Sequence, residues 1–211
     1  MDLMKSLKNC FSSSLEVSAL EAFAREGDWF TEGIMTVSTE LTCIEINSFY
    51  IQKLAERFPN ANIFNDDAHK VLDSISNCGA RFDLISLDNP QGLYCDEKYC
   101  EHFDVLPLAI KNLRSQGVLL FNVNLKPYDD RITLKEKNDN YGNNFEKWIE
   151  RRAEYYGEDN DLNVEFIMKF YKKILAQHGR ALRSFDSFNL DGSKFQQSKE
   201  NNIIRAVLRF E

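Results

Sequence analysis

Short apolar runs alternate along this chain with segments in which apolar residues recur at helical spacing. Residues 41–46 (Leu-Thr-Cys-Ile-Glu-Ile) form the clearest apolar run. A run this short and β-branched predicts a strand buried on both faces, as in parallel sheets that helices cover. The following residues carry apolar side chains at helical spacing up to Pro59, which predicts a helix that begins near Ser48.

Strand and helix alternate in this way up to residue 123. Residues 1–14 predict a short lead with one or two helical turns. The predicted strands are residues 15–19, 41–46, 62–65, 82–88 and 117–123, and the predicted helices lie near residues 29–35, 48–58, 68–76 and 104–115. Short connections between alternating strands and helices predict an α/β fold with a parallel, doubly wound sheet.

The last third of the chain departs from this alternation. Residues 144–156 and 162–178 predict two helices, and residues 181–190 and 202–210 predict two strands joined by a turn at residues 191–193. Two such strands predict an antiparallel hairpin at the end of the sheet. We expect residues 126–156, which begin with a long polar stretch, to form a lid at the ligand edge, because long polar loops commonly carry function.

Composition and charge favour one globular domain over residues 1–211. The chain is 43% apolar and 28% charged, which is ordinary for a domain of this length. Its net charge of −7 favours neither nucleic acid nor an anionic membrane as a partner. Five cysteines, an odd number, and the lack of a signal peptide or a long apolar span predict reduced thiols and a cytoplasmic protein.

Acidic residues stand where the predicted strands end. Glu45 closes the second strand, Asp67 precedes a helix, and Asp88 closes the fourth strand. Because ligands bind at the carboxyl edge of such sheets, these acids are candidates for ligand contacts. Glu45 can accept two hydrogen bonds from a ribose diol. The alternatives are structural: a solvated strand-end acid at Glu45, a helix N-cap at Asp67 and a turn cap at Asp88.

The order of these elements resembles the class I S-adenosylmethionine-dependent methyltransferases, from Ser14 to Phe210. The resemblance implies a Rossmann-like, mostly parallel seven-stranded sheet that ends in an antiparallel hairpin. It also implies S-adenosylmethionine as the cofactor and transfer of a methyl group to an O or N nucleophile. The acceptor, a small molecule or a macromolecule, is not identified by the sequence.

Three motifs carry cofactor residues over to this chain. Residues 42–47 are similar to the family's ribose-binding strand, which implies that Glu45 binds the ribose and Ile46 lies against the adenine. Residues 65–68 resemble the step that opens the next helix, which implies adenine contacts from Asp67 and from the backbone N–H of Ala68.

The first motif of the family is matched in a degenerate form. Residues 15–22 (Leu-Glu-Val-Ser-Ala-Leu-Glu-Ala) are similar to it, which implies that Glu16 contacts the methionine amino group and that Ser18 and Ala19 also bind the cofactor. Ser18 and Ala22 stand where the family has glycines. Glycine serves such turns because it has no Cβ and tolerates φ > 0.

Asp88 is the candidate catalytic residue. Residues 82–90 are similar to the family's strand that brings the acceptor to the methyl group, so an acid at Asp88 could act as a general base or orient the attacking group. Residues 88–94 also resemble the polyamine aminopropyltransferases, which share this fold. A further alternative is a catalytically degenerate member of the fold that serves as an interaction module. The sequence is also compatible with a homodimer.

The sequence gives only weak support for a metal site. Cys95, Cys100 and His102 lie close together, but their spacing is not that of a standard zinc site and no fourth ligand is evident, so no metal is predicted. Arg151 and Arg152 predict a solvated helix face.

Overall fold

The fold is built on one seven-stranded sheet. The computed structural model describes residues 3–12, 14, 16–27, 30–126, 145–157, 162–189 and 203–210. The strands of the sheet are β1 (Ser18–Ala22), β2 (Glu40–Ile44), β3 (Asn62–Phe64), β4 (Phe82–Leu87), β7 (Leu113–Asn124), β8 (Leu182–Asn189) and β9 (Ile203–Phe210). The helices that pack around it are α1 (Leu3–Cys10), α2 (Thr31–Met35), α3 (Ser48–Arg57), α4 (Ala68–Cys78), α5 (Leu106–Asn112), α7 (Phe145–Tyr156) and α8 (Val164–Gln177).

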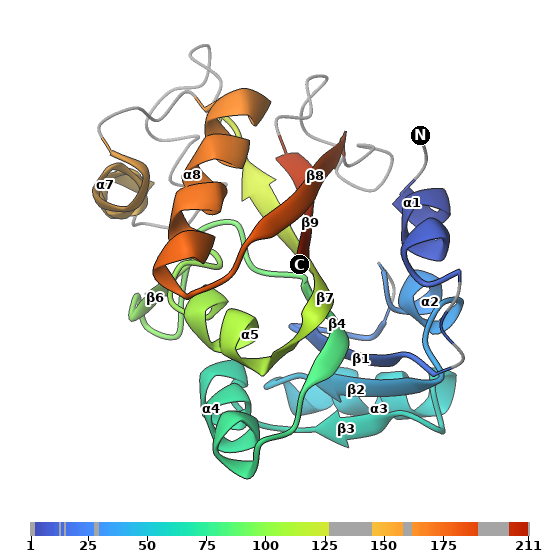
Figure 1. Cartoon of the computed structure of the whole chain (residues 1–211). Helices are drawn as coiled ribbons and strands as arrows, with labels where there is room; N and C mark the ends of the chain where they lie inside the picture. The colour runs from blue at the N-terminus through green and yellow to red at the C-terminus, as the bar shows by residue number, and fades with distance from the viewer. Residues whose placement is uncertain are drawn as a thin grey trace.

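The strand order confirms the predicted architecture. It runs β3-β2-β1-β4-β7-β9-β8 (Figure 1). The strands from β3 to β7 pair in parallel, whereas β9 is antiparallel to both of its neighbours, β7 and β8. The sheet is therefore mostly parallel with a C-terminal antiparallel hairpin. Its strand order reverses at β1 and β4, and ligands bind outside the carboxyl ends of the strands at such a point.

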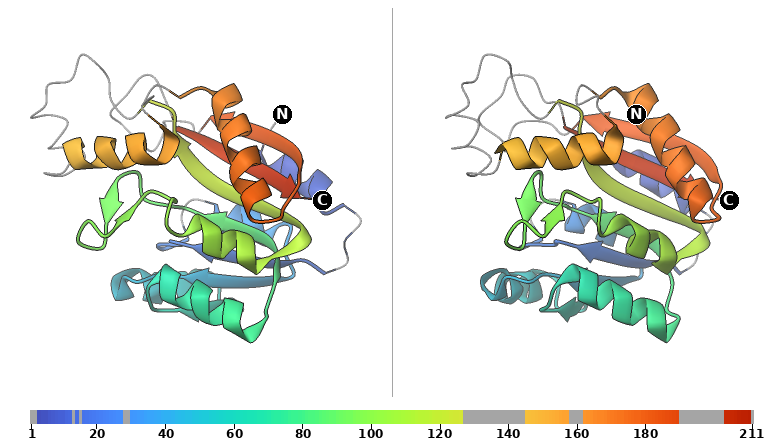
Figure 2. Two further views of the ribbon diagram at one scale, coloured as in Figure 1. Left: turned by 60° about the vertical axis from the view of Figure 1, so that its left-hand side comes forward. Right: turned by 90° about the vertical axis from the view of Figure 1, so that its left-hand side faces the viewer.

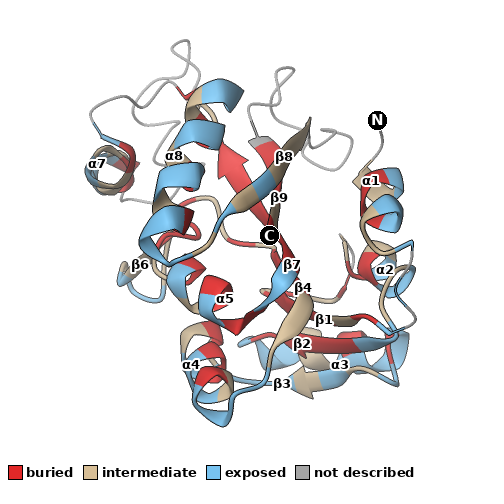
Figure 3. Cartoon of the chain, in the orientation of Figure 1, coloured by how far each residue is buried: buried red, intermediate tan, exposed pale blue. Residues whose placement is uncertain are grey.

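Helices cover both faces of the sheet (Figures 1 and 2). α4, α5, α7 and α8 pack on one face, and α1, α2 and α3 pack on the other. Within β4, Ile85 and Leu87 belong to the first core and Leu84 to the second, as the alternation of side chains along a strand requires. Figure 3 shows the buried residues gathered along the strands and the inner helix faces.

Side-chain caps begin the helices at the places that the sequence indicates. The Asn47 side chain accepts a hydrogen bond from the Phe49 N–H at the start of α3, and the Asp67 side chain accepts one from the His69 N–H at the start of α4. α4 ends at Gly79, whose φ of 77° is a left-handed conformation that favours glycine. The structural alternative for Asp67, an N-cap, is thus confirmed, and it is compatible with a ligand contact.

The first strand differs from the prediction. It spans Ser18–Ala22 and not residues 15–19. Its register with β2 pairs Ser18 with Glu40 and Ala22 with Ile44, so the strand continues through Glu21. The Glu21 side chain is ionisable, yet it is 1% exposed and accepts a hydrogen bond from the Thr31 hydroxyl at 2.6 Å.

Two further differences lie between β4 and the second half of β7. α5 ends at Asn112, and β7 begins at Leu113, where the prediction had helix to residue 115. The exposed polar residues at the start of β7 gave no strand pattern. The prediction also lacked a small antiparallel hairpin formed by β5 (Leu93–Tyr94) and β6 (Tyr99–Cys100). Its turn contains no glycine, although Cys95, Asp96 and Glu97 all have positive φ.

The predicted lid is described only in part. Residues 127–144 and the predicted turn at residues 191–193 lie outside the described residues. The remaining part of the predicted insert is mostly α7, and its Trp148 and Tyr156 are buried in the core. None of the helices within the described ranges is both long enough and apolar enough to span a membrane.

Candidate functional site

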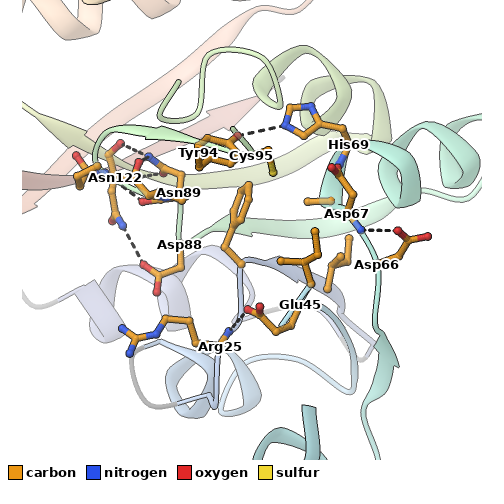
Figure 4. A pocket seen from close by; sticks show the side chains of 16 residues that line it. Arg25, Glu45, Asp66, Asp67, His69, Asp88, Asn89, Tyr94, Cys95 and Asn122 are labelled. Atoms are coloured by element: carbon orange, nitrogen blue, oxygen red, sulfur yellow. Dashed lines mark hydrogen bonds between the residues drawn. The ribbon is translucent and has the colours of Figure 1, made fainter. Parts of the chain in front are cut away.

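A cavity of about 480 Å³ opens at the carboxyl edge of the sheet (Figure 4). Its volume is in the range of small-molecule and cofactor sites. The turn after β1, the ends of β2, β4 and β7, the start of α4 and the β5–β6 hairpin all contribute to it. The lining residues are Phe23, Arg25, Ile44, Glu45, Ile46, Asp66, Asp67, Ala68, His69, Asp88, Asn89, Pro90, Gln91, Tyr94, Cys95 and Asn122.

Glu45 directly follows β2 and lies on the cavity wall. One of its carboxylate oxygens accepts a hydrogen bond from the Arg25 N–H at 2.8 Å, and the other accepts one from the Asn47 N–H at 2.7 Å. The residue is 7% exposed, so it is not the solvated strand-end acid of the structural alternative. Because each carboxylate oxygen has about two acceptor positions, both oxygens can still accept a further hydrogen bond from a ligand.

The residues next to Glu45 add apolar and polar groups to the same cavity wall. Ile46 is 57% exposed, which is high for a large apolar side chain at a cavity. The Asn65 side chain donates to the carbonyls of Glu45 and Ile46, both at 3.0 Å, and so fixes the backbone there. Asp67 and Ala68 reach the same cavity from the start of α4. The cavity thus brings together Glu45, Ile46, Asp67 and Ala68, as the sequence predicts.

The turn after β1 has an unusual backbone. Phe23 has φ 64°, Arg25 has φ 51° and Gly27 has φ 72°, so every second residue of this turn is in a left-handed conformation. Glycine adopts that conformation at no steric cost, whereas other residues pay of order 1–2 kcal/mol. Phe23 and Arg25 both line the cavity. Sequence reasoning missed them because it placed the glycine-bearing motif several residues too early.

The three predicted first-motif contacts lie elsewhere, so this part of the prediction is corrected. Glu16 precedes β1 and is exposed, and Ala19 is 1% exposed inside the sheet. The backbone N–H and hydroxyl of Ser18 donate to Asp83 at 2.9 and 3.0 Å, at the amino end of β1 and β4. None of the three is among the residues that line the cavity. The reason is the strand boundary, since the carboxyl end of β1 is Ala22.

Asp88 lies where the sequence predicts it, at the end of β4 on the cavity wall. The residues that hold its carboxylate are distant in the sequence. The Asn122 side-chain amide donates to its carboxylate at 2.9 Å, and the Arg205 guanidinium lies 3.6 Å from it. Arg205 comes from β9, is fully buried, and also donates to the Leu87 carbonyl at 3.0 Å and to the Asn122 side-chain oxygen at 2.7 Å. No local pattern in the sequence links Arg205 with Asp88.

A second acid lies beneath this pair. Burial of Glu21 raises the pKa of its carboxyl group from 4.5 to about 8, and the nearby charge of Asp88 acts in the same direction. Hydrogen bonds from Thr31 and the charge of Arg205 partly oppose this effect. Glu21 is therefore mostly protonated at neutral pH, and the Arg205 charge is balanced by Asp88.

Asn89 ties the cavity to the protein interior. Its side-chain oxygen accepts from the Asn122 N–H at 2.9 Å, and its amide donates to the Asn122 carbonyl at 3.2 Å, which joins the ends of β4 and β7. The same amide lies 3.5 Å from a ring nitrogen of His102, whose other ring nitrogen bonds to the Tyr171 hydroxyl. Burial lowers the pKa of His102 to about 3, so the ring is neutral.

One prediction for α7, the helix within the predicted insert, is wrong. Arg152 is fully buried and pairs with the buried Glu101, where the sequence predicted a solvated helix face. Trp148 donates to the same carboxylate at 2.9 Å, and Arg152 donates to the Asn124 carbonyl at 2.6 Å. These contacts fix α7 against the end of β7 and the segment after β6.

Aromatic side chains close the cavity opposite Glu45. The His69 ring stacks on Tyr99 with centroids 3.6 Å apart, and its Nε2 lies 3.2 Å from the Tyr94 hydroxyl. Phe23 packs edge-on against Tyr94 at 5.6 Å. The β5–β6 hairpin, which the sequence did not reveal, therefore supplies part of the wall.

Comparisons with known proteins bear on the fold. No protein-family model matches the chain, and no curated protein sequence matches it. Solved structures match nearly all of it. They include M. jannaschii TYW2 in complex with AdoMet, with 14% identity and a TM-score of 0.55 over 100% of this chain and 77% of that one. The N-methyltransferase NodS from Bradyrhizobium japonicum WM9 has 15% identity and a TM-score of 0.54 over 98% and 93% of the two chains.

A protein from Streptococcus mutans assigned to the SAM-dependent methyltransferases has 10% identity and a TM-score of 0.58 over 97% of this chain and 48% of that one. This chain thus has the fold of the S-adenosylmethionine-dependent methyltransferases. It spans about half the length of the Streptococcus mutans protein. At such low identities the likeness establishes the methyltransferase fold and leaves the activity to the site itself.

Proposed function

We propose that the chain is an S-adenosylmethionine-dependent methyltransferase that acts on an O or N nucleophile. The observation that carries the proposal is the cavity at the carboxyl edge, where Glu45, Ile46 and Asp67 converge from β2 and α4. Structural neighbours of the same fold were solved with AdoMet or SAH bound, which supports this choice of cofactor.

The residues present fit the adenosine part of that cofactor. The Glu45 carboxylate would accept hydrogen bonds from the two ribose hydroxyls while it keeps its contacts to Arg25 and Asn47. The exposed Ile46 side chain would be covered by the adenine ring. Asp67 would accept from the adenine amino group, and the Ala68 N–H lies among the first, unpaired N–H groups of α4.

When bound, the cofactor supplies an electrophilic methyl group on a sulfonium. The chain's own contribution is to hold the acceptor in line with that group and to exclude water. Asp88, which follows β4, presents its carboxylate to the cavity on the far side of β1 from Asp67. It is the residue that we assign to the acceptor.

Within this proposal Asp88 orients the acceptor. Arg205 and Asn122 hold its carboxylate in place, which makes it a well-positioned hydrogen-bond acceptor. Such a group binds the O–H or N–H of the attacking atom and so fixes the direction of attack.

The Asp88→Asn variant tests that role. We expect it to lower the turnover number by about 10²–10⁴-fold and to change the affinity for S-adenosylhomocysteine by no more than about threefold. An acceptor can be sought by incubating the protein with labelled cofactor and cell extract. Loss of cofactor binding in this variant would assign Asp88 to the cofactor pocket, and an unchanged turnover number would exclude it from the reaction.

Calorimetric titration of the chain with S-adenosylmethionine and S-adenosylhomocysteine tests the function as a whole. We expect saturable binding of both at micromolar concentration. No binding at millimolar ligand would reject the methyltransferase and support an interaction module. Tighter binding of decarboxylated S-adenosylmethionine than of the parent compound would support the aminopropyltransferase alternative.

A further inference from the structure

Arg25 stands at a position where the backbone favours glycine. Its φ of 51° costs a non-glycine residue free energy, as does the φ of 64° at Phe23 two residues earlier. Backbone N–H groups hold this turn: the Ala24 N–H donates to the Ile44 carbonyl, and the Arg25 N–H donates to the Glu45 carboxylate. Retained strain of this kind points to a role for the side chain itself.

The Arg25 side chain also brings a positive charge to a cavity wall that is rich in acids. Among the described residues that line the cavity, Arg25 is the single arginine or lysine, whereas Glu45, Asp66, Asp67 and Asp88 are acids. Burial lowers the pKa of His69, which keeps that ring neutral. The Arg25 guanidinium also lies 5.5 Å from the centre of the Tyr50 ring, which helps to hold it in place. Figure 4 shows it pointing away from Glu45.

The order of the strands places Arg25 between two ligand-binding positions. Along the carboxyl edge the sequence of contributions is Asp67 after β3, Glu45 after β2, Arg25 after β1 and Asp88 after β4. Neighbouring strands are about 4.8 Å apart, so these side chains form a row across the sheet. A nucleoside with its base at Asp67 and its ribose at Glu45 directs its 5′ substituent toward the turn after β1.

We propose that Arg25 binds the α-carboxylate of the amino-acid tail of the bound nucleoside, and this inference rests on the proposed function. The guanidinium pairs with a carboxylate through two parallel N–H···O bonds, a contact that is stronger than one between neutral groups. The glycine-like conformation at residue 25 is then the backbone arrangement that brings this cation to the ligand. Arg25 determines the preference for a ligand that retains its carboxylate.

Three ligands isolate this contact by calorimetry. S-Adenosylhomocysteine has the whole amino-acid tail, its decarboxylated analogue keeps only the amine, and 5′-methylthioadenosine has neither group. We expect the wild-type chain to bind S-adenosylhomocysteine about 10–100-fold more tightly than the decarboxylated analogue. In Arg25→Met, which keeps the length of the side chain, this ratio should fall below about threefold while the affinity for 5′-methylthioadenosine stays the same.

Arg114→Met is the matched control. Arg114 pairs with Asp83 at the opposite end of the sheet, and the wild-type ratio should persist in that variant. If the wild-type chain binds S-adenosylhomocysteine without preference for the carboxylate, or if Arg25→Met weakens all three ligands equally, the inference is wrong and the proposed function stands. If none of the three ligands binds to the wild-type chain, the proposed function itself fails.

Arg25→Gly gives an independent readout without a ligand. Relief of the left-handed strain should exceed the extra entropy of glycine in the unfolded chain, so the melting temperature should be unchanged or higher by up to about 3 °C. Arg114 lies in β7 and is not among the residues with positive φ. Arg114→Gly should therefore lower the melting temperature. A clear fall for Arg25→Gly would show that the side chain serves the fold and would overturn the inference.

Discussion

The two sides of the cavity are built in different ways. On the side of β2 and α4, the candidate residues are held by contacts of short or moderate sequence separation: the N–H groups of Asn47 and of Arg25, 20 residues away, donate to Glu45, and Asp67 accepts from the His69 N–H. On the side of β4, Asp88 is held by Arg205 and Asn122, which lie 117 and 34 residues away, with Arg205 on an antiparallel strand.

The difference teaches where local sequence signals suffice. A strand-end acid and a helix cap depend mainly on nearby residues, so their geometry follows from a few residues. The Asp88 side depends on a buried cation from the C-terminal hairpin, and removal of that cation breaks its ion pair with a nearly buried carboxylate. We therefore expect the two sides to respond differently to substitution, with stability affected mainly on the Asp88 side and ligand affinity mainly on the Glu45 side.

The largest effect is expected for Arg205→Met. Loss of the guanidinium removes the ion pair of Arg205 with Asp88, whose side chain is 8% exposed, and removes donors to Leu87 and Asn122. The free energy of unfolding should fall by about 3–5 kcal/mol in urea denaturation. Arg209→Met, on the same strand with a partly exposed ion pair to Asp186, should cost about 1 kcal/mol or less. Equal losses in the two variants would contradict this account.

The next effect concerns the pH dependence of stability. Because the folded pKa of Glu21 is raised from 4.5 to about 8, the native state holds a proton that the unfolded state has already lost in this window. Its contribution is complete below about pH 4.5 and is lost as pH rises toward 8, by up to about 1.4 kcal/mol per pH unit. Glu21→Gln should remove this slope. Parallel stability curves for the two proteins between pH 5 and 8 would show that Glu21 ionises normally.

The smallest effect is expected on the other side of the cavity. Glu45→Gln replaces one carboxylate oxygen by an amide that cannot accept, so the affinity for S-adenosylhomocysteine should fall by about 1.5–3 kcal/mol in calorimetry. The exposed Glu56→Gln, on α3, should leave the affinity unchanged. A wild-type affinity in Glu45→Gln would remove Glu45 from the site and would erase the contrast between the two sides.

The sequence by itself determined the architecture and one side of the site. Alternation of short apolar runs with helical segments is repeated over most of the chain, and the two final strands pair as an antiparallel hairpin. Glu45, Ile46, Asp67, Ala68 and Asp88 all reach the cavity because the carboxyl ends of parallel strands meet at one edge. These features depend on periodicity and on nearby residues, which a sequence displays directly.

Only the tertiary structure decided the rest. The sequence predicts a solvated helix face at Arg152, yet this residue is buried because Glu101, from a distant segment, pairs with it. Glu21 is likewise buried and accepts a hydrogen bond from Thr31. Burial of a charged or polar group is tolerated only where such partners exist, and no local pattern reveals them. The predicted first strand ended at residue 19, whereas β1 ends at Ala22, and the turn that carries Phe23 and Arg25 follows it. A conformation such as φ > 0 at these residues is stabilised by the surrounding fold, so the sequence, which shows no glycine there, gave no sign of it.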